Sequence, residues 1–138
     1  MKFYRKPIRK TSNRPSVVLY NKAWKIFSEY IRQRDKGICV TCHAVNHWKD
    51  CNAGHFKHGV LDFDEMNINC QCVGCNKWNH GRLDRYADFL REKYGDKAYE
   101  DLKIRASMAK KGHKYYPWEL EAIITEYKTK LSTLKEVL

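Results

Sequence analysis

The sequence predicts a small α+β protein with a cysteine-rich centre and helices on either side of it. Three observations support this fold class. All six cysteines lie between residues 39 and 75. Apolar residues recur at helical spacing both before and after that segment. The chain has 138 residues, which suits one domain with a modest core.

Composition excludes several classes of protein. Hydrophobic residues make up 43% of the chain and aromatic residues 13%, values that are typical of a folded protein and not of a disordered one. No apolar stretch approaches the length of a membrane span, and the first residues lack the apolar block of a secretory signal. We therefore expect a soluble, cytoplasmic protein with no membrane partner.

The first predicted segment is a basic arm, residues 1–16, which contains two prolines and has no periodicity. No acidic residue precedes Glu29, and eight basic residues do, against a net charge of +11 for the whole chain. This asymmetry favours a nucleic-acid partner, because cations that neutralise phosphates release condensed counterions. A solubilising tail or a site for another acidic partner is the alternative. The candidate DNA contacts in the arm are Arg5, Lys6, Arg9 and Lys10.

Helices are predicted on both sides of the cysteines. Before them, apolar residues favour a helix over 21–35 that ends near Gly37. After them come a helix over 83–94 closed by Gly95, a helix over 97–109, a polar break at 110–114, and a last helix opened by Pro117. The last helix has an apolar stripe: Trp118, Ile123, Ile124, Tyr127, Leu131, Leu134 and Leu138. We expect this stripe to pack on the chain's own core, with a dimer contact as the alternative.

The cysteines predict a structural zinc site. Two Cys-x-x-Cys turns, Cys39–Cys42 and Cys72–Cys75, are separated by about thirty residues, and two such turns complete a tetrahedral sulfur shell for Zn²⁺. The alternatives are two disulfides or a redox pair. Disulfides are rare inside cells, and a redox site needs only one pair. We interpret Cys51 and Cys70 as thiols outside the zinc site.

Between and after the two turns lie Ala53-Gly54-His55-Phe56, then Asn67, then Cys72-Val73-Gly74-Cys75-Asn76. This order resembles HNH nucleases, in which a zinc-stabilised ββα-metal (His-Me) finger carries the active site. It resembles most closely the phage NinG/Rap recombination proteins, over about residues 38–95. The resemblance implies that residues 17–95 form a zinc-knuckle nuclease domain and that residues 96–138 are a C-terminal helical extension.

The resemblance also implies roles for individual residues. His55 would be the general base, Asn67 would brace the loop that orients it, and Asn76 would face a catalytic Mg²⁺ or Mn²⁺. His80 lies one turn later, so an unbroken helix would put it beside Asn76, although Gly81 favours an earlier helix end. The duller alternatives are that His55 caps a loop or joins the zinc shell, and that Asn76 satisfies the knuckle backbone.

The sequence departs from one common HNH pattern, because Gly54 stands where many relatives carry an Asp or His ligand. Asp50, Asp62 or Asp64 could supply the missing group, but the spacing selects none of them. Further candidate contacts to the DNA backbone are Lys57, Lys77, Arg82 and Arg85, whose alternative is a solvated surface.

The function expected from this resemblance is a metal-dependent DNA endonuclease. Likeness to the phage recombination proteins implies branched DNA such as Holliday junctions, and a homodimer that makes paired cuts in a phage-infected host cell. One alternative is a non-catalytic zinc-knuckle module that binds DNA. A second is an HNH nuclease of the homing or restriction type that cuts linear duplex.

Overall fold

The computed structural model describes residues 14–137, so Arg5, Lys6, Arg9, Lys10 and Leu138 lie outside the described residues. The elements in chain order are α1 (Pro15–Arg34), the 3₁₀ turn η1 (Trp48–Asp50), β1 (Cys51–His55), β2 (Ile68–Cys72), the π-helical turn η2 (Gly74–Trp78), α2 (Leu83–Tyr94), α3 (Asp96–Met108) and α4 (Pro117–Val137). The described part of the chain is thus a small α+β fold, as predicted. None of its helices combines the length and apolar character needed to cross a membrane.

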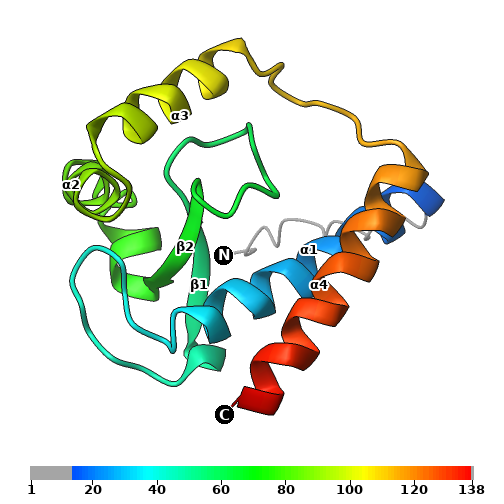
Figure 1. Ribbon diagram of the computed structural model, residues 1–138, viewed down its shortest axis with the longest axis horizontal. Coiled ribbons are helices and arrows are strands. Elements are labelled where there is room, and N and C mark those ends of the chain that lie inside the picture. Colours follow the sequence, from blue (N-terminus) through cyan, green and yellow to red (C-terminus); the bar gives the residue numbers. More distant parts are fainter. Residues whose placement is uncertain (1–13, 138) are drawn as a thin grey trace, which may run out of the picture.

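The centre of the fold is an antiparallel hairpin of two strands. β1 pairs with β2 in a register that sets Cys51 opposite Cys72 and His55 opposite Ile68. Figure 1 shows α1 and α4 side by side, and α2 and α3 at the opposite side of the hairpin. The segment after α3 crosses from one helical pair to the other (Figure 1).

Each face of the hairpin packs on its own group of apolar side chains. Towards α1 and α4, Ile68 of β2 is buried with Phe27, Ile31 and Tyr127, and Ala23, Leu120 and Ile124 extend the contact between the two helices. Towards α2 and α3 the buried cluster contains Val40, Phe56, Tyr86, Leu90, Tyr99 and Leu102. Ile124, Tyr127 and Leu131 of the predicted α4 stripe are therefore buried within the chain, as expected.

Two boundaries and one burial differ from the sequence prediction. The first helix begins at Pro15, so residues 15–20 are helical, although we predicted a later start and an arm that included 15 and 16. Proline is favoured at the first helical position because its fixed φ suits a helix and its missing N–H leaves nothing unpaired. Trp118, assigned to the apolar stripe of the last helix, is 67% exposed, because it lies two residues before the buried Leu120 and therefore on the other side of α4.

The end of α1 is set by Gly37, as predicted. Gly37 has φ +69°, and a Cβ at this position would collide with the backbone oxygen of Asn46. Only glycine combines this left-handed backbone with so close an approach of another segment. The turn directs the chain into the first cysteine pair.

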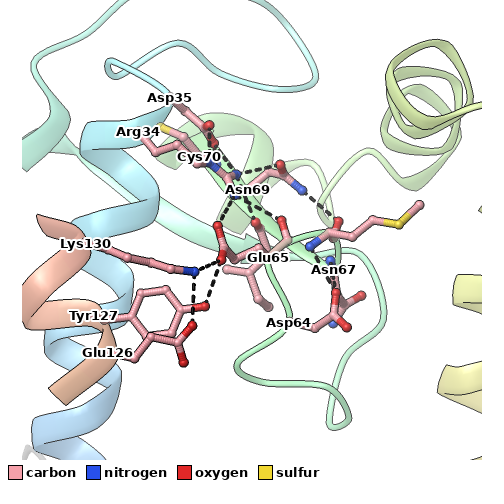
Figure 2. A network of polar contacts seen from close by, with 12 residues as sticks. Arg34, Asp35, Asp64, Glu65, Asn67, Asn69, Cys70, Glu126, Tyr127 and Lys130 are labelled. Carbon is pink, nitrogen blue, oxygen red and sulfur yellow. Dashed lines mark hydrogen bonds and ion pairs between the residues drawn. The ribbon is translucent and has the colours of Figure 1, made fainter. Parts of the chain in front are cut away.

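A polar network fixes the hairpin against both terminal helices (Figure 2). At the end of α1, Arg34 donates to the side chain of Asn69 at 2.9 Å and to the backbone oxygen of Glu65 at 3.1 Å. From α4, Lys130 and Tyr127 donate to the Glu65 carboxylate at 2.8 and 3.0 Å. The network holds the loop between the strands, residues 56–67, in place beneath α1 and α4.

Candidate functional site

The four cysteines of the two Cys-x-x-Cys turns converge on one point. Their Sγ atoms all lie within 4.8 Å of one another, and those of Cys42 and Cys72 are 3.7 Å apart. Zinc–sulfur bonds of about 2.3 Å in a tetrahedron place the sulfurs ~3.8 Å apart. The donor set and its spacing therefore fit a metal ion such as zinc.

Backbone hydrogen bonds bring the two turns together. Cys72 is the last residue of β2, and the π-helical turn that follows carries Cys75. The first turn docks on β2 through the Val40 N–H, which donates to the Cys70 oxygen at 2.8 Å. Within the described residues, the cysteines are the only group of three or more His, Cys, Asp and Glu side chains arranged to hold a metal. His55, Cys51 and Cys70 are outside it, which removes the possibility that His55 joins the zinc shell.

His55 is the last residue of β1 and lies where the hairpin meets α1. Its ring stacks on the Trp24 ring of that helix, with centroids 5.3 Å apart and planes 21° apart. Its Nε2 lies 3.3 Å from Oδ1 of Asp62, and the side chain is 20% exposed. Nδ1 makes no hydrogen bond to another described residue. The ring is thus held by its neighbours and still reached by solvent.

Asp62 fixes the protonation pattern of this histidine. The hydrogen bond from His55, helped by one from the Tyr20 hydroxyl at 2.7 Å, outweighs burial and holds the pKa of Asp62 below its ordinary value. A carboxylate only accepts hydrogen bonds, so the neutral His55 ring carries its proton on Nε2. The lone pair of Nδ1 is then available to accept a proton.

The sequence offered three aspartates that could lie near His55, and the structure places Asp62 there. Asp64 instead caps the loop, accepting from the backbone N–H groups of Met66 and Asn67 at 3.0 and 3.1 Å. Asp50 is exposed in the 3₁₀ turn η1. The sequence carried no signal for this choice, because Asp62 approaches His55 only when the loop between the strands closes.

A second histidine lies beside the first. The ring of His58 is 5.8 Å from that of His55, with planes 23° apart. Burial, followed by the nearby charge of His55, lowers the pKa of His58. His58 is therefore kept neutral at pH 7 and adds no fixed charge beside His55.

Asn67 is fully buried and joins the two ends of the loop that contains Asp62. Its Oδ1 accepts from the Lys57 N–H at 2.8 Å, and its Nδ2 lies 3.1–3.2 Å from the backbone oxygens of Lys57, Val60 and Leu61. One side chain thus holds the segment that begins two residues after His55. These are contacts that a loop-bracing residue would make.

The packing around Gly54 explains why no Asp or His ligand precedes His55. A Cβ at Gly54 would collide with Oε1 of Gln71 on the paired strand. Gln71 is itself buried, and its Nε2 donates to the Gly81 oxygen at 2.9 Å and to the Thr41 hydroxyl at 3.3 Å. The place that a longer residue at 54 would need is therefore occupied by a side chain that anchors the segment after η2.

Asn76 and His80 do not share a helical face. η2 ends at Trp78, and His80, Gly81 and Arg82 all have positive φ, at 52°, 80° and 44°. The unbroken helix that would set His80 one turn after Asn76 is absent. Asn76 lies half-buried on η2, whereas His80 is exposed on the turn that follows. These two residues do not fit a preformed pair of cation ligands.

Comparison with known proteins identifies the family. The family model for the bacteriophage lambda NinG protein matches residues 4–136. The chain belongs to the NinG family. It is 32% identical over 139 residues to the protein ninG of Salmonella phage P22, covering 94% of this chain and 64% of the relative.

Two more NinG relatives give a similar result. Protein ninG of Escherichia phage 933W is 30% identical over 135 residues, covering 93% of this chain and 64% of the relative. Protein ninG of Escherichia phage lambda is 30% identical over 135 residues, covering 93% and 63%. The chain therefore spans less than two thirds of the length of these relatives. No solved structure matches it.

The basic residues assigned to DNA contact in this NinG-family chain lie in different surroundings. Lys77 and Arg85 are exposed, and Arg85 lines a hollow together with Asp88 and Glu92. Arg82 is half-buried ahead of α2. Lys57 has its Nζ 5.2 Å from the centre of the Phe56 ring and lines a different hollow with His58. Of the four, Lys57 is the one next to the His55 site.

Proposed function

We propose that this NinG-family protein is a metal-dependent DNA endonuclease in which His55 is the general base. One observation carries the proposal: His55 has one ring nitrogen bound to Asp62 and the other free, in a side chain that solvent reaches. A histidine that serves only as packing would not need a partly buried carboxylate to select its tautomer. The family resemblance agrees with this role but does not test it.

In the proposed reaction, Nδ1 of His55 takes a proton from a water molecule. The water oxygen forms a bond to phosphorus, and the bond from phosphorus to the 3′-oxygen breaks. The 3′-oxygen leaves with a proton from solvent, so that the products are a 5′-phosphate and a 3′-hydroxyl. Asp62 stays ionised throughout and stabilises the imidazolium that forms.

A bound Mg²⁺ or Mn²⁺ would supply stabilisation of the charge that develops on the phosphoryl oxygens. The described residues offer no preformed cluster of acidic or histidine ligands for it, and Asn76 and His80 are separated by the end of η2. The proton transfer to His55 does not depend on which residues hold the cation.

Branched DNA as substrate, a role in phage recombination and action as a homodimer are further parts of the proposal. They are supported by the likeness of the cysteine and Gly-His motifs to phage recombination proteins. The competing function is a DNA-binding module without catalysis. The missing cluster of cation ligands favours that alternative.

Cleavage assays separate these functions. Four-way, flapped and linear DNA are incubated at one salt concentration with Mg²⁺ or Mn²⁺, using the full chain and His55→Ala. We expect cleavage by the unmodified chain, fastest on the branched substrates, and its loss in the variant. If both bind a junction equally and neither cuts, the binding module is correct. Equal rates on the three substrates would remove the preference for branches.

A further inference from the structure

The segment between α3 and α4, residues 109–116, faces the loop that holds Asp62 across a continuous groove. Three hollows follow one another along it. The first joins Lys57 and His58 to Lys103 and Lys111. The second joins residues 59–62 to Lys110, Gly112 and His113. The third joins the start of α1 to His113, Lys114 and Tyr115. We call this path the linker groove.

Neighbouring hollows share residues, which makes the path continuous. Val60 and Ala109 line both the first and the second, and His113 and Tyr115 line both the second and the third. The path is lined by two neighbours of the candidate base, although His55 itself lines none of the three hollows. His58, whose ring lies beside that of His55, lines the first hollow, and Asp62, which binds His55, lines the second.

The charge along the linker groove is positive, and most of its lysines have no acidic partner. Lys57, Lys110, Lys111 and Lys114 form no ion pair with any residue from 14 to 137, whereas Lys103 pairs with Glu100 at 3.1 Å. The one acidic side chain that lines the path is Asp62, and its two oxygens already accept from Tyr20 and His55. By contrast, the hollow that contains Arg85 on α2 also contains two acids. Phosphates are held best where cations lack other partners.

We propose that the linker groove carries the phosphate backbone of a DNA strand past His55, with the lysines of the α3–α4 linker as its main cations. This deepens the proposed nuclease function and rests on it for the identity of the strand. Within residues 14–137, the principal surface for DNA is then the linker groove. Lys77, Arg82 and Arg85, the candidate DNA contacts from the sequence, lie outside it. Figure 1 shows the linker crossing between the two helical pairs, where it can close one side of the path.

The test compares two triple variants of the full chain that lose the same charge. The first is Lys110→Gln/Lys111→Gln/Lys114→Gln. The matched control is Lys36→Gln/Lys97→Gln/Lys128→Gln, three exposed lysines without an ion pair to a described residue, on other parts of the surface. Binding of a labelled four-way junction is measured by fluorescence anisotropy over a range of salt concentrations, without added Mg²⁺ or Mn²⁺.

Each lost phosphate contact lowers the slope of log affinity against log salt by about 0.7–0.9. We therefore expect the linker variant to lose about 2 units of slope and at least about tenfold in affinity at low salt, while the control changes by less than about threefold. Equal losses in the two variants, or an unchanged slope in the first, would overturn the proposal. Cleavage by the unmodified chain is a separate readout, so a failed nuclease and a failed groove are distinguishable.

Discussion

At the scale of single residues, the partner of one ring nitrogen decides what a histidine can do with the other. Nε2 of His55 faces the Asp62 carboxylate, so the neutral ring must present an unprotonated Nδ1. Stacking on Trp24 fixes the plane of the ring as well. Asp62 is therefore a positioning residue, and its effect is separable from that of His55.

Asp62→Asn tests this role. An amide at 62 that keeps its oxygen on the Tyr20 hydroxyl turns its N–H₂ towards His55, which favours the tautomer with the proton on Nδ1. We expect cleavage to fall about 100-fold, the usual contribution of a general base. The ¹⁵N chemical shifts of the ring report the tautomer directly, whether or not the variant cuts DNA.

Tyr20→Phe is the matched control for that variant. It removes one hydrogen bond to Asp62 and leaves the carboxylate, so His55 should keep its proton on Nε2 and cleavage should fall less than about tenfold. A ring in Asp62→Asn that keeps the Nε2 proton would contradict the assignment.

Gly54→Ala tests the close packing behind His55. The new Cβ would collide with Gln71, which would have to leave the Gly81 oxygen and the Thr41 hydroxyl. We expect a loss of about 1–3 kcal/mol in the free energy of unfolding, the cost of leaving buried polar groups unpaired. Urea denaturation measures it. In a Gln71→Ala background the same change at 54 should cost far less, and an additive cost would refute the collision.

The sequence supported much of the candidate site and missed two parts of it. The four cysteines and Asn67 were identified from their motifs, because paired Cys-x-x-Cys turns imply a common site even when thirty residues separate them. Asp62 did not follow, because its approach to His55 depends on closure of the loop between the strands. Gly54 looked like a missing ligand, and its reason is a side chain on the neighbouring strand.

At the scale of elements, helical spacing was informative only where the helix continues. α2, α3 and α4 have nearly the predicted bounds because apolar periodicity and the terminal Gly95 and Pro117 all agree. Asn76 and His80 do not lie on one helical face, because the helical turn that carries Asn76 does not continue to residue 80. The Gly81 N–H donates to the Cys75 oxygen and its own oxygen accepts from Gln71, so tertiary bonds hold the chain in a turn there.

The cysteine pair at the end of the hairpin links element formation to metal binding. Cys75 lies on η2 and Cys39 on the loop that follows α1. Loss of either thiolate should therefore leave the metal ion that joins the two turns with an incomplete set of ligands. We expect Cys75→Ser to purify with less than one zinc per chain and to lose its cooperative melting transition. Elemental analysis and circular dichroism measure these two results.

Cys51→Ala is the control for metal loss, since its thiol is buried outside the cluster and accounts for no ligand. This variant should retain one zinc per chain. A native-like melting transition in metal-stripped, unmodified protein would contradict the structural role of the ion.

At the scale of the whole molecule, the hairpin lies between α1 and α4, which come from opposite ends of the described chain, and the consecutive helices α2 and α3. Periodicity identified the apolar faces of α1 and α4, but it contained no information on their mutual contact. Trp118 illustrates the limit: the buried residues of α4 are Leu120, Ile124, Tyr127 and Leu131, and Trp118 is two residues out of step with them and exposed. An apolar residue near a helix end is thus buried only if it lies on the face that the partner helix covers.

Glu65 joins these distant parts through one carboxylate, which accepts from Lys130 and Tyr127 of α4 and faces Arg34 of α1 (Figure 2). Burial alone would raise the pKa of Glu65, but these donors outweigh it and hold the pKa below its ordinary value of 4.5. A carboxyl group with a lowered pKa stabilises the fold above its unfolded pKa. That contribution is lost as the pH falls through the folded value.

Glu65→Gln should therefore lower the free energy of unfolding by about 1–2 kcal/mol near pH 7, at the lower end of the value for hydrogen bonds to a charged group because the side chain is 33% exposed. The difference from the unmodified chain should stay constant down to about pH 5.5 and then shrink below about pH 4.5, as the pH falls from the unfolded pKa of Glu65 through its lower folded pKa. Glu126→Gln is the control, because Glu126 pairs with the same Lys130 but is 54% exposed. It should cost less than about 0.5 kcal/mol. Equal costs for the two variants, or a Glu65→Gln deficit that does not shrink at all as the pH falls below 4.5, would mean that the carboxylate does not hold the two terminal helices to the hairpin loop.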